Sequence, residues 1–267
     1  MPAIPDTSPP PATRTARDSA PVASLTTQFN TVAVRRAGER VDLEVEGATF
    51  ATWHPRHAFT GYSWDALAAA ALLRSSGPPA SVLLLGLGGG TVTRQLRALL
   101  PAVRLVGVEI DAGVIDLART YMALDEQRVE VHIEDAYGYL ARTAEQFDVV
   151  LDDLFLTGPD DVVRTRVPQG ETLKLLRARV APGGLFVANL ITDAGEHKSV
   201  RQAARKAFAD AFPVSRVVTP PRGLNEILVG GDEVLPRSAL AEWAPKLADP
   251  YDRARLTEID VKLLKRP

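Results

Sequence analysis

The chain contains no cysteine, which excludes disulfide bonds, thiolate metal ligands and a cysteine nucleophile. It has only four histidines, and no two of them have the spacing of a helical zinc motif. The formal net charge is −2, so no strong overall field draws the protein to nucleic acid or to an anionic membrane. No apolar run approaches the roughly 20 residues that cross a bilayer. These absences favour a protein that acts on small molecules, with no metal, nucleic-acid or membrane partner.

The N-terminal residues also lack a basic segment followed by an apolar one, so no secretory signal is predicted and a cytoplasmic location is expected. Residues 1–28 are rich in proline, serine, threonine and alanine and have no apolar periodicity, which predicts a disordered tail. The chain has 267 residues, 46% of them hydrophobic. This length suits one large domain with a modest appendage.

Residues 29–60 are predicted to form a small antiparallel β-sheet domain. Thr31–Arg36 and Arg40–Glu46 have the length and composition of two hairpin arms. In the second arm, apolar residues alternate with acidic ones, which is typical of a half-buried strand. Ala48–Trp53 is a candidate third strand. A helix is predicted over Gly61–Leu73, where alanine and leucine dominate.

The segment Val82–Asp111 reads as strand, glycine turn, helix and strand, the first half of a nucleotide-binding βαβ unit. Its turn contains Gly86, Gly88, Gly89 and Gly90. Glycine lets the backbone bend sharply and approach a ligand beside the helix N-terminus. Glu109 follows the second strand, where a carboxylate can accept hydrogen bonds from both hydroxyls of a ribose. This pattern predicts a site for an adenosine-containing cofactor.

From Val82 onward, strands alternate with helices, which predicts an α/β fold with a mostly parallel sheet over residues 61–267. The expected strands are Val82–Leu85, Val103–Val108, Val129–Ile133, Phe147–Leu151, Leu185–Leu190, Val214–Val218 and Glu226–Val229. The last two are close enough in the chain to pair antiparallel. Seven strands that close in this way match the Rossmann-like sheet of class I methyltransferases. The C-terminal segment, Arg237–Lys262, is predicted to be helical and peripheral.

Acidic residues follow the later strands as well. The third strand ends in Glu134-Asp135-Ala136, and the fourth ends in Asp152-Asp153. Ligands of open α/β sheets bind where the carboxyl ends of the strands converge. We therefore expect Asp135 to hold the adenine amino group and Asp152 or Asp153 to face the reacting centre.

Two observations qualify this site. Acids in strand-to-helix loops are also common helix N-caps, and Asp111 fits a cap as well as it fits a binding role. The third glycine of a dinucleotide motif would fall at Thr91, which disfavours NAD.

The succession G-L-G-G-G, V-E-I-D, E-D-A and F-D-V-V-L-D-D resembles the spermidine synthase-like (polyamine aminopropyltransferase-like) branch of the class I S-adenosylmethionine-dependent methyltransferase superfamily, over Gly61–Gly230. The resemblance implies a transferase that uses S-adenosylmethionine or decarboxylated S-adenosylmethionine without a metal, and it suggests a homodimer. Cofactor binding is expected at Gly86, Gly88, Gly90, Glu109, Asp135 and Ala136. The family's catalytic aspartate follows the fourth strand, so Asp153 fits that role, and Asp152 is one residue away.

Two acids of that family are replaced in this chain. An acid of its glycine motif, which contacts the donor amine, is replaced by Gly89, and a second loop acid, which grips a diamine, is replaced by Leu156. A charge-assisted hydrogen bond contributes about 1.5–3 kcal/mol, so the two losses disfavour cationic partners. We therefore expect methyl transfer to an amine or similar nucleophile, with an acceptor more apolar than putrescine.

Two alternatives remain. The first is aminopropyl transfer from decarboxylated S-adenosylmethionine to a polyamine, with Asp65, Asp152 and Asp160 supplying the missing charges. The second is a non-catalytic nucleotide-binding partner protein.

The resemblance also places an aromatic residue and an acid against the acceptor, in the helix before the first core strand. Tyr62, Trp64 and Asp65 are the candidates there, and Phe155 is a candidate from the loop after the fourth strand. The three aromatic residues fit core packing equally well. His54 and His57 are further candidates for a base, although histidines in a proline-flanked loop are commonly only solvated.

Overall fold

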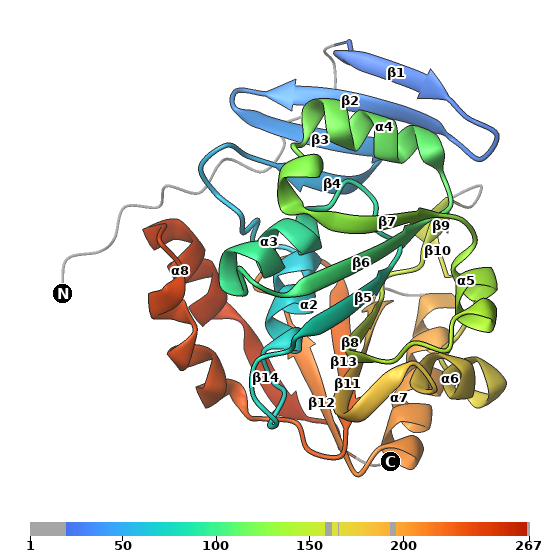
Figure 1. Ribbon diagram of the computed structural model, residues 1–267, viewed down its shortest axis with the longest axis vertical. Helices are drawn as coiled ribbons and strands as arrows, with labels where there is room; N and C mark the ends of the chain where they lie inside the picture. Colours follow the sequence, from blue (N-terminus) through green and yellow to red (C-terminus); the bar gives the residue numbers. More distant parts are fainter. Residues whose placement is uncertain (1–19, 158–161, 165, 193–195, 266–267) are drawn as a thin grey trace.

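The computed structural model describes residues 20–157, 162–164, 166–192 and 196–265. A small antiparallel sheet lies above a large, mostly parallel sheet that has helices on both faces (Figure 1). The small sheet consists of β1 (Ala23–Thr26), β2 (Thr31–Ala37), β3 (Arg40–Val45) and β4 (Ala48–Trp53), in that spatial order. The expected hairpin and third strand are therefore confirmed.

Strand β1 corrects one prediction. Residues 23–26 fall in the segment 1–28 that was expected to be a disordered tail, but they pair antiparallel with β2. The strand has only four residues and its side chains are mostly exposed, so its short alternation of apolar and polar residues does not stand out in the sequence. Residues 1–19 lie outside the described residues.

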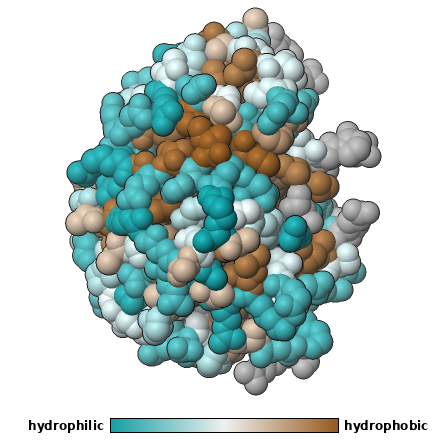
Figure 2. Space-filling model, turned by 45° about the vertical axis from the view of Figure 1, so that its right-hand side comes forward, coloured by the Kyte–Doolittle hydropathy of each residue, from teal (hydrophilic) through white to brown (hydrophobic). Residues whose placement is uncertain are grey.

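The small sheet packs on helix α4 (Ala112–Tyr121). Val32, Val34, Val41 and Leu43 are fully buried and share one cluster with Val114 and Met122. Figure 2 shows hydrophobic surface gathered just below the top of the molecule, where the small sheet meets the main domain.

The large sheet has eight strands, in the order β14-β12-β13-β11-β8-β5-β6-β7. They are β5 (Ser81–Leu85), β6 (Arg104–Glu109), β7 (Val129–Ile133), β8 (Phe147–Asp152), β11 (Val180–Ile191), β12 (Val214–Thr219), β13 (Asn225–Gly231) and β14 (Asp260–Leu263). The pairs from β11 through β7 are parallel, and β13, β12 and β14 pair antiparallel. The expected class I methyltransferase-like sheet is confirmed, with one additional strand.

The other helices are α2 (Ser63–Ala71), α3 (Thr91–Leu99), α5 (Ala136–Arg142), α6 (Gly170–Arg177), α7 (Glu196–Ala211) and α8 (Pro250–Glu258). Short 3₁₀ turns span Asp125–Gln127, Arg237–Glu242 and Ala244–Lys246, and two short strands, β9 (Leu156–Thr157) and β10 (Val162–Val163), follow β8. Alternate residues of the parallel strands face two cores, one with α2 and α3 and the other with α5, α6 and α7.

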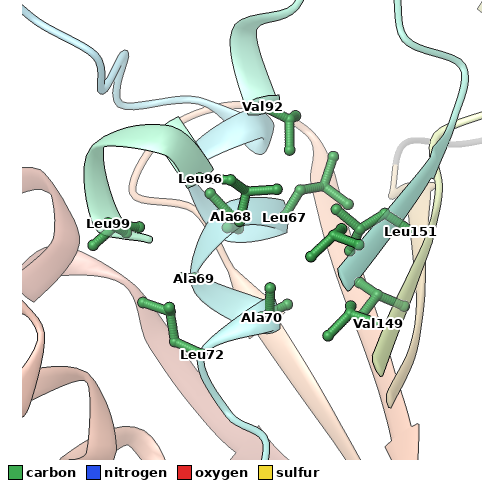
Figure 3. Close-up of a cluster of buried hydrophobic side chains, with 14 of the residues drawn as sticks. Leu67, Ala68, Ala69, Ala70, Leu72, Val92, Leu96, Leu99, Val149 and Leu151 are labelled. Atoms are coloured by element: carbon green, nitrogen blue, oxygen red, sulfur yellow. The ribbon is translucent and has the colours of Figure 1, made fainter. Parts of the chain in front are cut away.

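The burial of most of helix α2 explains why it is rich in alanine. Every residue from Ala66 to Ala71 is fully buried, and Figure 3 shows Leu67, Ala68 and Ala70 packed between α3 and the sheet strands. Alanine lets a helix approach its neighbours closely on all sides. The position of α2 matters for the site, because its first turn reaches the cavity described below.

The C-terminal segment differs from the sequence prediction. It was expected to be helical and peripheral, but β14 pairs with β12 at the edge of the sheet. Leu256 and Ile259 are buried in the core that also holds α2. The strand is only four residues long, which is too short for an alternating pattern to stand out.

Candidate active site

A cavity of about 550 Å³ lies between the small sheet and the carboxyl ends of the parallel strands. This is where ligands bind in open α/β sheets, and the volume is typical of small-molecule sites. The structure brings most of the expected site residues into one wall: Gly86, Gly88, Glu109, Asp135, Ala136 and Asp153. The three acids and two glycines at the ends of different strands therefore meet as the sequence suggests.

The glycine turn after β5 makes a close contact that requires glycine. Gly86 has φ +84° and Gly88 has φ +54°, both in the left-handed region that favours glycine. A Cβ on Gly86 would lie 2.5 Å from the backbone oxygen of Asp153. The absence of a side chain at Gly86 thus lets the turn lie directly against the residue after β8.

Gly89 and Gly90 are surrounded by side chains of neighbouring elements, unlike Gly86. A Cβ on Gly89 would lie 2.5 Å from Cβ of Ala51 and 2.6 Å from Sδ of Met122. A Cβ on Gly90 would lie 2.7 Å from Leu124. Neither glycine lines the cavity, and Gly90 is instead the N-cap of α3. A side chain at position 89 would start against Ala51 of the small sheet and against Met122, the residue after α4. The structure therefore gives no support to the inference drawn from Gly89 about the donor.

Glu109 is fixed by three backbone amides. The N–H of Gly88 donates to Oε2 at 2.9 Å, and the N–H groups of Ile110 and Asp111 donate to Oε1 at 2.9 and 3.1 Å. Burial raises the pKa of Glu109, and the three amides oppose that shift. A carboxylate oxygen accepts about two hydrogen bonds, so Oε2 keeps capacity for a ribose hydroxyl.

Asp111 and Asp135 are both helix caps. Asp111 accepts a hydrogen bond from the N–H of Gly113 at 2.9 Å and another from the hydroxyl of Thr27 at 2.7 Å. Asp135 accepts one from the N–H of Gly138 at 2.8 Å and begins α5. Both side chains also line the cavity, so capping and a binding role are compatible at the two positions.

The adjacent acids Asp152 and Asp153 have different environments. Asp152 is fully buried and forms an ion pair with Arg164, whose guanidinium also donates to the backbone oxygen of Asn189. Asp152 does not line the cavity, whereas Asp153 does. Burial raises the pKa of Asp153 to about 6, while a hydrogen bond from Asn189 and the nearby Arg164 oppose the shift. Asp153 thus reaches the cavity with a pKa suited to accepting a proton near neutral pH.

Two asparagines, which the sequence analysis missed, support Asp153. Nδ2 of Asn189 donates to Oδ1 of Asp153 at 2.7 Å. Nδ2 of Asn225 donates in turn to Oδ1 of Asn189 at 3.0 Å. Both residues line the cavity. Asn189 is the polar residue in the buried run L-F-V-A-N-L of β11, and that interruption was the available signal.

The expected acceptor residues divide into two groups. Tyr62, Trp64 and Phe155 line the cavity, and the guanidinium of Arg164 lies 5.2 Å from the ring centroid of Phe155. Asp65 is fully buried and is absent from the cavity wall.

Asp65 instead organises the start of α2. Its carboxylate accepts hydrogen bonds from the backbone of Thr60 and Gly61 and from the side chain of Gln95. Burial raises the pKa of Asp65 to about 6. These contacts assign Asp65 to the turn that carries Tyr62, and they keep it from an acceptor amine.

The two candidate histidines lie outside the cavity wall. The rings of His54 and His57 stack with centroids 4.6 Å apart, and Nδ1 of His57 lies 3.0 Å from Oδ2 of Asp249. They therefore connect the end of the small-sheet domain to the segment before α8. Asp160 and the Gly158-Pro159 pair lie outside the described residues.

No metal-binding group of three or more histidine, cysteine, aspartate or glutamate side chains is found in the described part of the chain. No helix among the same described residues has the length and apolar character needed to cross a membrane.

Comparison with known proteins finds matches over much of this chain. The spermine/spermidine synthase domain family matches residues 66–226, more than half of the chain. A probable polyamine aminopropyl transferase of Bifidobacterium longum is 32% identical over 162 residues, which cover 60% of this chain and 34% of that protein. The polyamine aminopropyltransferase of Aeropyrum pernix is 32% identical over 174 residues, 60% of this chain and 54% of that protein. The chain thus spans about a third to a half of the length of these relatives.

Solved structures agree on the fold. A probable spermidine synthase from Corynebacterium glutamicum has a TM-score of 0.72 at 18% identity, and the alignment covers 92% of each chain. Similarity at this level of identity supports the architecture, including the small N-terminal sheet.

The comparisons also correct the expected chemistry. Methyl transfer was favoured from the sequence, but several curated relatives that match 60–69% of this chain are named as aminopropyltransferases. An eEF1A lysine and N-terminal methyltransferase of Danio rerio matches less extensively, with 30% identity over 145 residues, 50% of this chain and 21% of that protein. The preference for methyl transfer is therefore wrong, which agrees with the position of Gly89 outside the cavity.

Proposed function

The chain belongs to the spermine/spermidine synthase domain family, and we propose that it transfers an aminopropyl group from decarboxylated S-adenosylmethionine to an amine acceptor. The observation that carries this proposal is the placement of Asp153. Its carboxylate lies in the cavity wall, beside the glycine turn, and is oriented by Asn189. The names of the aminopropyltransferase relatives supply the donor and the class of acceptor.

The adenosine half of the donor lies against the ends of β5, β6 and β7. Glu109 accepts hydrogen bonds from the ribose hydroxyls, and the turn that contains Gly86 and Gly88 borders the ligand. Asp135 and the adjoining Ala136 border the adenine. The cavity of about 550 Å³ accommodates this half with space left for an acceptor.

The reaction is a direct displacement at carbon. The lone pair of the acceptor nitrogen forms a bond to the aminopropyl carbon attached to the sulfonium, and the carbon–sulfur bond breaks. Its electron pair stays on sulfur, so methylthioadenosine leaves as a neutral product. The new ammonium gives a proton to Asp153, which is ionised at neutral pH because its pKa is about 6. The protein otherwise contributes proximity and alignment.

Asp152 and Arg164 hold the end of β8 in place. Their buried ion pair lies next to Asp153, and Arg164 also connects this strand end to β11 through the backbone of Asn189. Asp152 is therefore a positioning residue in this proposal. The homodimer expected from the resemblance stays a prediction.

The test is release of methylthioadenosine from decarboxylated S-adenosylmethionine in the presence of a set of primary amines, measured by mass spectrometry. Asp153→Asn should lower kcat/KM about 100-fold or more, because proton transfer typically contributes at least that factor. Binding of methylthioadenosine to this variant, measured by calorimetry, should remain.

Asp260→Asn is the matched control, since Asp260 lies on β14 and pairs with Lys262 far from the cavity. Its kcat/KM should equal that of the wild type. Unchanged turnover by Asp153→Asn would exclude the role of Asp153 as proton acceptor. Release of methylated products from intact S-adenosylmethionine, with no use of the decarboxylated donor, would contradict the proposed reaction.

A further inference from the structure

The small sheet contributes an acid to the cavity. Asp42 lies on β3 between Val41 and Leu43, which are fully buried and share a cluster with residues of α4. Because successive side chains of a strand point to opposite faces, Asp42 faces away from α4. Asp42 lines the cavity, and its side chain is 13% exposed. The cavity therefore has a carboxylate on its small-sheet side as well as at the ends of the parallel strands.

Two side chains of the same sheet hold this carboxylate. The hydroxyl of Thr52 donates a hydrogen bond to Oδ1 of Asp42 at 2.8 Å, and Nη2 of Arg40 lies 2.8 Å from Oδ2. Burial raises the pKa of Asp42, and the charge of Arg40 opposes that shift. A carboxylate oxygen accepts about two hydrogen bonds, so both oxygens keep capacity for a further donor.

Asp42 is also fixed relative to the glycine turn after β5. It pairs across the sheet with Thr52 of β4. The hydroxyl of Thr91 accepts a hydrogen bond from the backbone N–H of Thr52 at 2.9 Å and donates to its backbone oxygen at 3.0 Å. Thr91 is the first residue of α3 and directly follows the turn. A Cβ on Gly88 would lie 3.4 Å from the backbone oxygen of Phe50, which is also in β4. Asp42 is therefore one strand away from the turn that borders the proposed donor.

Other acids of the described cavity wall have different contacts. Glu109, Asp111 and Asp135 accept hydrogen bonds from backbone N–H groups around the proposed adenosine site. Asp153 is the proposed proton acceptor. Asp42 is held by side chains of the small sheet instead. It therefore offers a charge that neither adenosine binding nor proton transfer uses.

Both substrates of the proposed reaction carry an ammonium group that does not react. The donor has one at the end of its aminopropyl chain, and a polyamine acceptor keeps a second one while its first amine attacks. Taking an ammonium group out of water is unfavourable unless a counter-charge accompanies it. A carboxylate in the cavity wall supplies that charge, and a hydrogen bond between two charged groups is stronger than one between neutral groups.

We propose that Asp42 binds a non-reacting ammonium group of the substrates on the small-sheet side of the cavity. This inference rests on the proposed aminopropyl transfer and adds a binding residue to it. Arg40 competes with the ammonium group for the carboxylate, and its positive charge repels that group. Removing Arg40 should therefore strengthen the contact that removing the charge of Asp42 abolishes.

The first comparison asks whether the ammonium group belongs to the donor. Calorimetry compares decarboxylated S-adenosylmethionine with 5′-dimethylsulfonio-5′-deoxyadenosine, which keeps the sulfonium but lacks the aminopropyl chain. In Asp42→Asn, the affinity for the decarboxylated donor should fall about tenfold or more, because a charge-assisted hydrogen bond is lost. The affinity for the shorter sulfonium should equal that of the wild type.

The second comparison asks whether the ammonium group belongs to the acceptor. Protein loaded with methylthioadenosine is titrated with 1,4-diaminobutane and with n-butylamine, which differ by the second amine. If the acceptor is the source, Asp42→Asn should weaken binding of the diamine about tenfold or more and leave the monoamine unchanged. A selective loss in either comparison supports the inference and identifies the source. No loss in both comparisons, an equal loss for both ligands of each pair, or no binding of any amine-containing ligand by the wild type would overturn it.

A variant at Arg40 separates binding from structure. Arg40→Gln should tighten binding of the ligand that Asp42→Asn weakens by about threefold or more, because a competing charge is removed. A purely structural ion pair predicts weaker binding in both variants, and that result would overturn the inference. If Asp42→Asn does not fold, as judged by thermal unfolding, Arg40→Gln decides, and the absence of tightening would overturn the inference.

Glu44→Gln is the matched control. Glu44 lies two residues further along β3 and pairs with Arg35 at 2.7 Å, but it is outside the cavity wall. This variant also removes an acid that is paired with an arginine, so all four affinities should equal those of the wild type.

The two proposals fail in different ways. Wild-type protein that binds the decarboxylated donor but releases no methylthioadenosine with any amine would exclude aminopropyl transfer. The affinities are measured without turnover, so they decide separately whether Asp42 binds an ammonium group.

Discussion

The side-chain amide of Asn189 donates a 2.7 Å hydrogen bond to the carboxylate of Asp153, and Asn225 fixes the orientation of that amide. This bond favours the charged form of Asp153 and opposes the effect of burial on its pKa. The chain of two asparagines therefore orients the proposed proton acceptor and lowers its pKa against the larger effect of burial.

Replacing Asn189 should change the pH dependence of the reaction. Since the ionised carboxylate is the active form, wild-type activity should fall as the pH drops through about 6. In Asn189→Leu the hydrogen bond is lost, so the pKa of Asp153 rises and the acidic limb of the kcat/KM profile moves to higher pH. A profile measured from pH 5 to 9 checks this expectation. A uniform loss of activity with an unmoved limb would show that Asn189 contributes only to structure.

Gly89→Asp should destabilise the fold without improving binding of the decarboxylated donor. Its Cβ would lie 2.5 Å from Ala51 and 2.6 Å from Met122, so overpacking should lower the free energy of unfolding by about 1–3 kcal/mol, and the buried charge adds to that loss. Urea denaturation measures the change, and Gly89→Ala reports the steric part alone. A stable Gly89→Asp protein with increased affinity for decarboxylated S-adenosylmethionine would contradict the assignment of this position to packing.

Removing Arg164 should leave Asp152 as a buried charge without its partner. The side chains of the pair are 2% and 0% exposed. Breaking such a pair typically costs about 3–5 kcal/mol, so Arg164→Met should lower the free energy of unfolding by about that amount. The double variant Arg164→Met/Asp152→Leu removes both charges and should recover much of the loss. If the single variant is as stable as the wild type, the pair does not stabilise the end of β8.

Sequence patterns predicted the helices and strands whose apolar residues are regularly spaced or that lie next to a distinct turn. Strand Val129–Ile133 has the predicted bounds, because the spacing of its apolar residues indicates which face packs on the core. The convergence of Glu109, Asp135 and Asp153 followed from the parallel sheet, in which the carboxyl ends of neighbouring strands share one edge.

The patterns could not show where a given side chain points. Gly89 and Asp65 occupy positions that the family resemblance relates to amine binding, yet position 89 packs against Met122 and Asp65 is enclosed by Thr60 and Gln95. Met122 and Gln95 are about 30 residues away in the chain, so the sequence pattern could not show these contacts. The same limit explains why the pairing of Asn189 with Asp153 was not anticipated.

The contact between Gly86 and the backbone oxygen of Asp153 has an evolutionary consequence. It joins the turn at the proposed donor site to the proposed proton acceptor, so a side chain at position 86 would disturb both at once. Leu156, at the start of β9, and Leu224, just before β13, also line the cavity but belong to other segments of the chain. A substitution at either leucine can therefore reshape the cavity wall without touching the contact between Gly86 and Asp153.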